Sequence, residues 1–252
     1  MNKKERFLAI DARNKLGIDI FEPIENIENL LFKKQGISII KKKMSSKISG
    51  ICTKSNDNTM AILVNTSYSL GRQNFTIAHE YYHLMFDYDL NKYSKDKETQ
   101  ANTFASYFIM PKEALEYYLE KKGIGRKKDD LTQDDIIEIS TYFKMSYLAV
   151  LVRLEKFEKL ISKDKANEYK NLNAHNLALL NGIFTNLYNA TEEKFSAKTN
   201  YVEEVKKAFE SNKITIGKYE SLLLEGGFED VVFGLDSSTA EGVNDGIIED
   251  YM

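Results

Sequence analysis

The stretch TIAHEYYHLMF, residues 76–86, places two of the chain's three histidines four residues apart in an otherwise apolar run. Positions i and i+4 share one face of a helix, so His79 and His83 could both direct a ring nitrogen at one metal ion. Glu80 directly follows the first histidine, and this HExxH pattern is typical of metal-dependent hydrolases. A metal ion lowers the pKa of a water molecule, and Glu80 would take its proton as general base.

Two histidines on a helix surface that bind nothing would look the same, so the metal site needs a third ligand. Glu98 opens the segment ETQANTFASYFIM, on the helical face of its small apolar residues, and would complete a His2Glu site. Asp89 stands where some HExxH enzymes carry a third histidine, but Phe86 stands where their pattern needs glycine. His175 is a third candidate, remote in the sequence. We favour Glu98, and expect Asn102 to hydrogen-bond one of the two histidines.

The composition is that of a globular protein with a hydrophobic core: 252 residues, 42% hydrophobic and 29% charged. A formal net charge of -3 gives no general attraction to nucleic acid or to acidic membranes. Cys52, the one cysteine, can form neither an intrachain disulfide nor a cysteine-rich zinc site. The charged start does not resemble a signal peptide, and no apolar run reaches the roughly 18 residues of a membrane span. We therefore expect a cytoplasmic protein with no membrane partner.

The hydrophobic pattern predicts an α+β protein that is mainly helical. Helices are expected at residues 2–16, 24–36, 69–86, 98–110 and 112–122. The β-rich runs ISIIKKKM, KISGICTKS and TMAILVN predict a small antiparallel sheet, the last two as a hairpin. Ser69 is the expected N-cap of the helix that carries HEYYH. Two amphipathic helices joined near Lys144–Ser146 predict a helix-turn-helix-like pair.

Two segments resemble the ImmA/IrrE family of metallo-endopeptidases. That family carries an RQ-F-x-AHExxH helix followed by an E-x-x-AN-x-FA-x-x-LMP helix, and RQNFTIAHEYYHLMF and ETQANTFASYFIMP match them here. The strand ending ILVN and the segment FKMSYLAVLVRLEKFEKLI are also similar, so that the resemblance covers about residues 5–161. Tyr81 and Tyr82 depart from it, because many members have smaller residues at these positions.

The resemblance implies a zincin-like metallopeptidase core in which His79, His83 and Glu98 hold zinc and Glu80 is the general base. Manganese or another divalent ion would suit the same ligands. It also implies an antirepressor that cleaves a helix-turn-helix transcriptional repressor of a mobile element or a stress regulon. The edge of the small sheet, TMAILVN, would bind the substrate as an added strand. Tyr82, Tyr88 and Tyr93 are nearby candidates for stabilising an oxyanion.

The expected domain organisation follows from these assignments. It comprises a zincin-like metallopeptidase domain (1–120), a helix-turn-helix-like segment (129–162), a C-terminal helical region of unknown role (163–227) and an acidic, flexible tail (228–252).

Two other classes of function remain open. The chain could be a DNA-binding or repressor-docking module whose metal site is structural, because KKGIGRKK provides a basic flank to the helix-turn-helix-like pair. Its second helix is mostly apolar, however, with Arg153 and Lys156 as its main polar side chains, whereas a recognition helix needs an exposed polar face. The chain could also be an inactive scaffold, but a structural zinc site has no use for Glu80.

Overall fold

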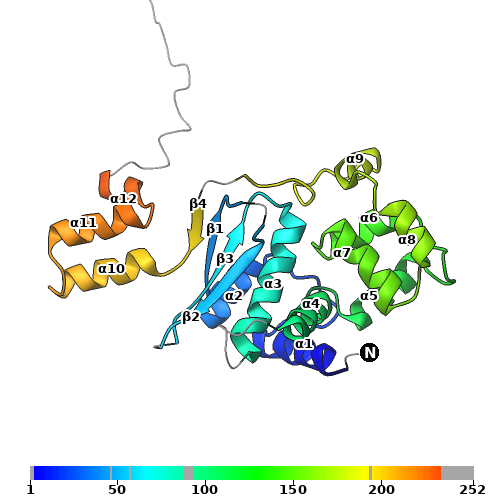
Figure 1. Ribbon diagram of the computed structural model, residues 1–252, viewed down its shortest axis with the longest axis horizontal. Helices are drawn as coiled ribbons and strands as arrows, with labels where there is room; N and C mark the ends of the chain where they lie inside the picture. The colour runs from blue at the N-terminus through cyan, green and yellow to red at the C-terminus, as the bar shows by residue number, and fades with distance from the viewer. Residues whose placement is uncertain (1–2, 46, 57, 88–93, 193–194, 234–252) are drawn as a thin grey trace, which may run out of the picture. The chain divides into compact units, whose positions relative to one another are not determined.

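The computed structural model describes residues 3–45, 47–56, 58–87, 94–192 and 195–233 (Figure 1). The chain forms two compact units, residues 1–198 and residues 199–252. The expected acidic tail lies outside the described residues from 234 onward. No helix in the described ranges has the length and apolar character needed to cross a membrane.

Unit 1 is a mainly helical α+β structure, which confirms the predicted fold class. In chain order its elements are α1 (Lys3–Leu16), α2 (Ile27–Gln35), β1 (Ser38–Lys42), β2 (Gly50–Lys54), β3 (Met60–Asn65), α3 (Leu70–Phe86), α4 (Lys95–Ile109), α5 (Lys112–Lys122), α6 (Gln133–Tyr142), α7 (Tyr147–Val152), the π-helix η1 (Arg153–Phe157), α8 (Lys163–Tyr169), α9 (Ala174–Leu180) and β4 (Phe195–Lys198).

The four strands form one mixed sheet in the order β2-β3-β1-β4. The predicted β2–β3 hairpin is antiparallel, as expected. The prediction of a wholly antiparallel sheet is wrong, because β3 pairs with β1 in parallel, with Ile39 opposite Ile62. The chain reverses between β1 and β2 and again in the β2–β3 hairpin, so β3 runs in the same direction as β1. Period-2 patterning does not specify which strands become neighbours.

Strand β4 was not predicted, and it changes which edges of the sheet are free. It pairs antiparallel with β1, with Ile40 opposite Ala197, and so covers that edge. β3, the run TMAILVN, is a central strand whose Ile62 and Val64 are fully buried. The expectation that β3 is the substrate-binding edge is therefore wrong, and β2 is the edge strand beside α3.

Helices α3 and α4 pack closely through small residues, which brings their polar side chains together. Ala78 on α3 and Ala101 and Ala105 on α4 are fully buried. Tyr81 and Tyr82, the bulky departures from the family pattern, are also buried. Their rings lie 6.1 and 5.4 Å from that of Phe104, so they fill the core beside this contact rather than the metal-binding face.

The first turn of α3 is capped by a distant segment rather than by the predicted Ser69 side chain, which makes no capping hydrogen bond. The backbone N–H of Leu70 donates to the carbonyl of Asn189 at 3.0 Å, and that of Gly71 donates to Leu187 at 2.8 Å. These carbonyls satisfy amides that a helix leaves unpaired at its N-terminus. We call residues 187–192, which run on toward β4, the strap.

The helix-turn-helix-like pair α6–α7 packs against the same end of α3. Its turn contains Lys144 at φ 55°, and the Asn74 side chain on α3 donates to the Lys144 carbonyl at 2.9 Å. A Cβ atom at Gly71 would lie only 2.9 Å from the backbone nitrogen of Ser146, so glycine permits this approach. The pair is therefore part of unit 1, in contact with the helix that carries the two histidines.

Unit 2 is a small helical unit made of α10 (Tyr201–Glu210), α11 (Ile216–Glu225) and α12 (Glu229–Phe233). Val205 and Leu223 are its buried aliphatic residues. The rings of Phe209 and Tyr219 lie 5.0 Å apart and hold α10 against α11.

Candidate metal centre

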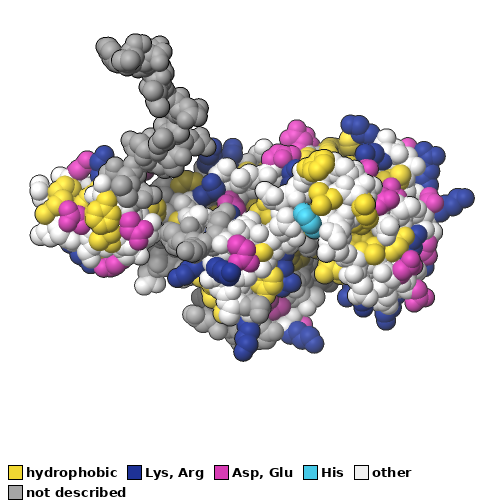
Figure 2. Space-filling model, turned by 90° about the horizontal axis from the view of Figure 1, so that it is seen from above, with side chains coloured by type: hydrophobic (Ala, Val, Ile, Leu, Met, Phe, Trp, Pro, Cys, Tyr) yellow, Lys and Arg dark blue, Asp and Glu magenta, His cyan; other side chains and the backbone are white. Residues whose placement is uncertain are grey.

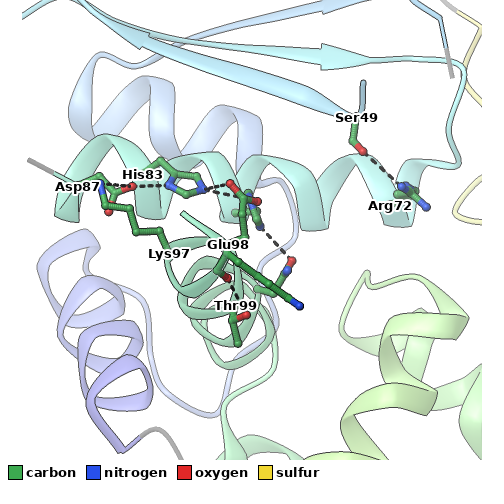
Figure 3. Close-up of polar contacts among 10 residues, drawn as sticks. Ser49, Arg72, His83, Asp87, Lys97, Glu98 and Thr99 are labelled. Carbon is green, nitrogen blue, oxygen red and sulfur yellow. Dashed lines mark hydrogen bonds and ion pairs between the residues drawn. The ribbon is translucent and has the colours of Figure 1, made fainter. Parts of the chain in front are cut away.

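Successive turns of α3 and the first turn of α4 bring His79, His83 and Glu98 together. The Nε2 atoms of the two histidines are 3.1 Å apart. Glu98 Oε2 lies 3.2 Å from His79 Nε2, and Glu98 Oε1 lies 3.6 Å from His83 Nε2 (Figure 3). One ligand atom from each residue can be chosen so that all lie within 4.8 Å of one another, and the group could hold a metal ion.

The spacing of these atoms suits a tetrahedral metal ion. Ligands about 2.0–2.1 Å from a tetrahedral zinc ion lie about 3.3 Å from one another. The 3.1 Å between the two Nε2 atoms and the 3.2 Å between His79 Nε2 and Glu98 Oε2 are close to that value, whereas the 3.6 Å to His83 Nε2 is measured from the other carboxylate oxygen. The Glu98 side chain is 37% exposed, so the group is open to solvent on one side.

His79 is oriented by the asparagine that the sequence singled out. Its Nδ1 lies 3.0 Å from Asn102 Oδ1, one turn beyond Glu98 on α4. Because a carbonyl oxygen only accepts, Nδ1 donates this bond and carries the proton. The lone pair of Nε2 is then free to face Glu98.

His83 is oriented by Asp87, which the sequence reasoning missed. Its Nδ1 lies 2.7 Å from Asp87 Oδ2, and Lys97 Nζ lies 3.5 Å from the same oxygen. An ionised carboxylate only accepts, so His83 also carries its proton on Nδ1. The signal was available, because Asp87 follows His83 by four residues and therefore lies on the same helical face.

The donor set fits a divalent cation. Two imidazole lone pairs and one carboxylate converge, and groups of this kind repel one another unless a positive charge lies between them. Two histidines and a glutamate are the ligands of one well-known type of catalytic zinc site, which leaves a fourth position for water.

Glu80 lies on the side of α3 that faces the edge strand. A Cβ atom at Gly50 of β2 would lie 3.4 Å from Glu80 Cγ. Burial, followed by the charge and hydrogen bonding of Glu80, raises the pKa of the Cys52 thiol. Cys52 is only partly buried and packs at the edge of the core. The Glu80 side chain therefore lies between α3 and β2, the strand to which a peptide could bind.

Among the residues that the structure describes, the edge strand has no neighbour on its outer side and presents backbone groups there. At its two ends, Asn65 N–H donates to Ser49 and Ser55 N–H donates to Thr59, each at 2.9 Å. Bonded and non-bonded pairs alternate in an antiparallel ladder, so every second residue of β2 directs its N–H and C=O away from β3. These residues are Gly50, Cys52 and Lys54.

Of the other residues considered for the site, those that the structure describes are not among the grouped ligands. Asp89, Tyr88 and Tyr93 lie outside the described residues. His175 is in α9 and is not a member of the metal-ligand group. Tyr82 is buried and donates its hydroxyl hydrogen to Gln100 Oε1 at 3.2 Å, so it packs beneath the site.

Comparison with known proteins places this part of the chain in a family. Residues 32–155 match the family model of peptidase family M78, described as the IrrE N-terminal-like domain. Residues 32–155 thus carry a domain of the ImmA/IrrE type, as the two motifs implied, and that family is one of metallopeptidases and IrrE-type regulators. Helix α1, the strap and β4 lie outside the matched residues.

One similar solved structure is a Mycobacterium tuberculosis transcriptional regulator. It is 17% identical, with a TM-score of 0.42, over 60% of this chain and 47% of that chain. The chain therefore spans about half the length of that regulator, and the likeness is too low to support an argument. No curated protein matches the chain.

Proposed function

We propose that the chain is a zinc-dependent endopeptidase with His79, His83 and Glu98 as metal ligands and Glu80 as general base. The convergence of the three ligand atoms carries this proposal, because their spacing suits a tetrahedral ion and their hydrogen-bond partners leave lone pairs facing inward. Asn102 and Asp87 fix the two imidazole rings, which is the usual task of outer residues at zinc sites. Manganese remains an alternative metal for this ligand set.

The reaction would use a water molecule as nucleophile. When bound, zinc supplies a lowered water pKa of about 7 and polarises the scissile carbonyl. Glu80 would take the proton from this water and pass it to the nitrogen of the departing amine. Its side chain lies beside Gly50 of the edge strand, where the peptide would bind. The buried packing around Tyr82 holds the helix that carries the acid–base group in one position.

The substrate would bind as an added strand along β2. The outward N–H and C=O groups of Gly50, Cys52 and Lys54 would pair with an extended peptide. Such a peptide passes the Glu80 side of α3, where one of its carbonyls meets the ligand group. This assignment replaces the central strand β3, which has a neighbour on both sides.

The proposed substrate is a helix-turn-helix transcriptional repressor of a mobile element or a stress regulon. The match of residues 32–155 to the IrrE N-terminal-like domain supports this choice. Cleavage between the DNA-binding and dimerisation parts of the repressor would relieve repression, and the chain would act as an antirepressor.

The test is incubation of the zinc-loaded protein with helix-turn-helix repressors from the same organism, beginning with any that is encoded beside its gene, followed by mass analysis of the fragments. We expect cleavage by the wild-type protein and none by Glu80→Gln, which keeps its zinc because residue 80 is not a ligand. Glu120→Gln makes the same change at an exposed position on α5 and should cleave normally. Intact repressor with the wild-type protein, or equal cleavage by Glu80→Gln, would contradict the proposal.

DNA binding with a structural metal site is the second candidate function, and the structure supports it less. Arg153 is fully buried and its Nε lies 2.8 Å from Glu158 Oε1, so it cannot reach a base. The exposed side of α7 carries Leu148 and Val152, which are 54% and 44% exposed. The face in Figure 2 shows basic side chains among acidic and hydrophobic ones rather than one basic field. A gel-shift assay with operator DNA would test this reading.

A further inference from the structure

Arg72 lies on the same face of α3 as the first metal-ligand histidine. It precedes His79 by seven residues, which is two helical turns, so the two side chains leave the helix in nearly the same direction. At 1.5 Å per residue the two positions are about 10 Å apart along the helix axis.

The Arg72 guanidinium is exposed but held in place. It stacks on the ring of Tyr68, with its carbon 4.2 Å from the ring centroid, and donates to Ser49 Oγ at 3.3 Å. Figure 3 shows Ser49 and Arg72 facing each other, toward the opposite end of α3 from Asp87. Within the described parts of the chain, no carboxylate forms an ion pair with this guanidinium. A guanidinium has five N–H donors, so most of them remain available for a ligand.

Arg72 also marks one end of the free sheet edge. Ser49, its hydrogen-bond partner, directly precedes Gly50, the first residue of β2. Cys52, two residues further, lies beside Glu80. Strand β2 and helix α3 therefore run in the same direction, with Arg72 at the start of both and the acid–base group further along.

We propose that Arg72 determines substrate specificity by binding an aspartate or glutamate about three residues from the scissile bond. An extended peptide advances about 3.3 Å per residue, so three residues span the 10 Å between the ligand group and Arg72. A planar guanidinium accepts a carboxylate through two parallel hydrogen bonds, which gives geometric selectivity. The proposal rests on the proposed peptidase function and adds the substrate chemistry that the site selects.

The direction of the bound peptide relative to β2 determines whether its acidic residue lies N-terminal or C-terminal to the scissile bond. A peptide antiparallel to β2 would run from Glu80 toward Arg72 and place its acidic residue C-terminal to the scissile bond. A parallel peptide would place it N-terminal to that bond.

The experiment is cleavage of a peptide library, prepared from a digested cell lysate, by the zinc-loaded full chain. Mass spectrometry identifies the residues on both sides of each cut. Cuts that the Glu80→Gln variant also makes are left out as background. We expect Asp and Glu to be enriched about threefold to fivefold two to four residues from the cut on one side, the size of an exposed ion pair. Arg72→Glu should replace this preference by one for Lys and Arg. Arg126→Glu, the same charge change at an exposed loop position, should keep the wild-type preference.

The outcomes separate the two proposals. Cleavage without an acidic preference, or a preference unchanged by Arg72→Glu, overturns the role of Arg72 and leaves the peptidase intact. No cleavage beyond that of Glu80→Gln overturns the proposed function and this inference with it. A glutamate in the first turn of a helix is favourable to the helix dipole, so Arg72→Glu should fold. If it does not, Arg72→Gln serves instead, with loss of the preference expected and its retention overturning the inference.

Discussion

At the residue scale, the two histidines of the candidate site are held by chemically different partners. Asn102 is neutral and comes from α4, whereas Asp87 is charged and comes from the end of α3 itself. The Asp87 side chain is only 7% exposed, so its hydrogen bond to His83 is shielded from water. A charged acceptor makes an imidazole a stronger ligand, and we expect Asp87 to contribute more to metal affinity than Asn102.

Asp87→Asn should weaken zinc binding about tenfold to a hundredfold, as for other outer residues at zinc sites. The amide removes the negative charge that favours a proton on Nδ1 of His83. Competition with a chromophoric chelator measures the change.

Asp96→Asn is the control, because this exposed residue in the first turn of α4 contacts neither histidine. Equal zinc affinities for Asp87→Asn and wild type would show that Asp87 does not act on the metal site.

Cys52 reports on the position of Glu80. Burial and the adjacent carboxylate raise the pKa of its thiol, and only the thiolate reacts with iodoacetamide. Each unit of pKa rise lowers the thiolate fraction about tenfold, so labelling at about pH 8 should be at least that much slower than in urea. Because the pKa is raised, the rate should keep rising with pH and reach no plateau by about pH 10.

Glu80→Gln should speed this labelling, because it removes the negative charge that disfavours the thiolate. Glu120→Gln should not change it. If Glu80→Gln and the wild-type protein react equally fast, the two side chains are not neighbours in solution.

The sequence specified the ligand group well because its geometry is local. His79 and His83 share a helix face through their spacing, as do Glu98 and Asn102, so only the packing of two helices had to be inferred. The proximity of Glu80 to Gly50 could not be read in this way, because it depends on which strand lies at the edge. The catalytic and ligand roles of these residues stay predictions.

At the element scale, the contact between α3 and β2 depends on a residue without a side chain. A Cβ atom at Gly50 would lie 2.4 Å from Thr76 Cγ2 and 3.0 Å from the Leu63 carbonyl oxygen. Gly50→Ala should therefore push the edge strand away from α3 and lower the free energy of unfolding by about 1–3 kcal/mol, as overpacking does. Urea denaturation measures this loss.

A second substitution tests the cause. Thr76→Ser removes the methyl group that the new Cβ would meet, so the double variant should recover part of the lost stability. Gly217→Ala is the control, because a Cβ atom at this position in α11 meets nothing within 4 Å. Unchanged stability in Gly50→Ala would show that the strand does not approach α3 this closely.

The elements themselves followed from local signals, but their arrangement did not. Gly36 ends α2 in the left-handed conformation at φ 67°, as is common for a glycine that directly follows a helical run. The pairing of β4 with β1 joins segments more than 150 residues apart, and a short strand carries little pattern of its own. The prediction that the Ser69 side chain caps α3 was wrong for the same reason. The carbonyls that cap this helix belong to the strap, which lies far along the chain.

At the scale of the whole molecule, the strap and β4 make unit 1 longer than its family segment. The family match ends at residue 155, whereas unit 1 extends to residue 198. Besides the two carbonyls on the first turn of α3, Thr191 Oγ1 accepts from the buried Gln73 side chain at 3.1 Å. Leu187 is itself only 2% exposed, so the strap also contributes apolar contact.

Two truncations test this extent of the unit. A chain that ends at Ser162 keeps every residue of the candidate site but loses the strap and β4, which leaves two amides of α3 and the edge of β1 without partners. Each lost hydrogen bond costs about 0.5–1.5 kcal/mol and each buried side chain adds about 1.5–3 kcal/mol, which together approach the whole stability of a domain. We therefore expect this chain to lose cooperative thermal unfolding and zinc binding, whereas a chain that ends at Lys198 should keep both. Differential scanning calorimetry and zinc titration of the two chains decide the matter, and wild-type zinc affinity in the shorter chain would mean that α3 holds its histidines without the strap.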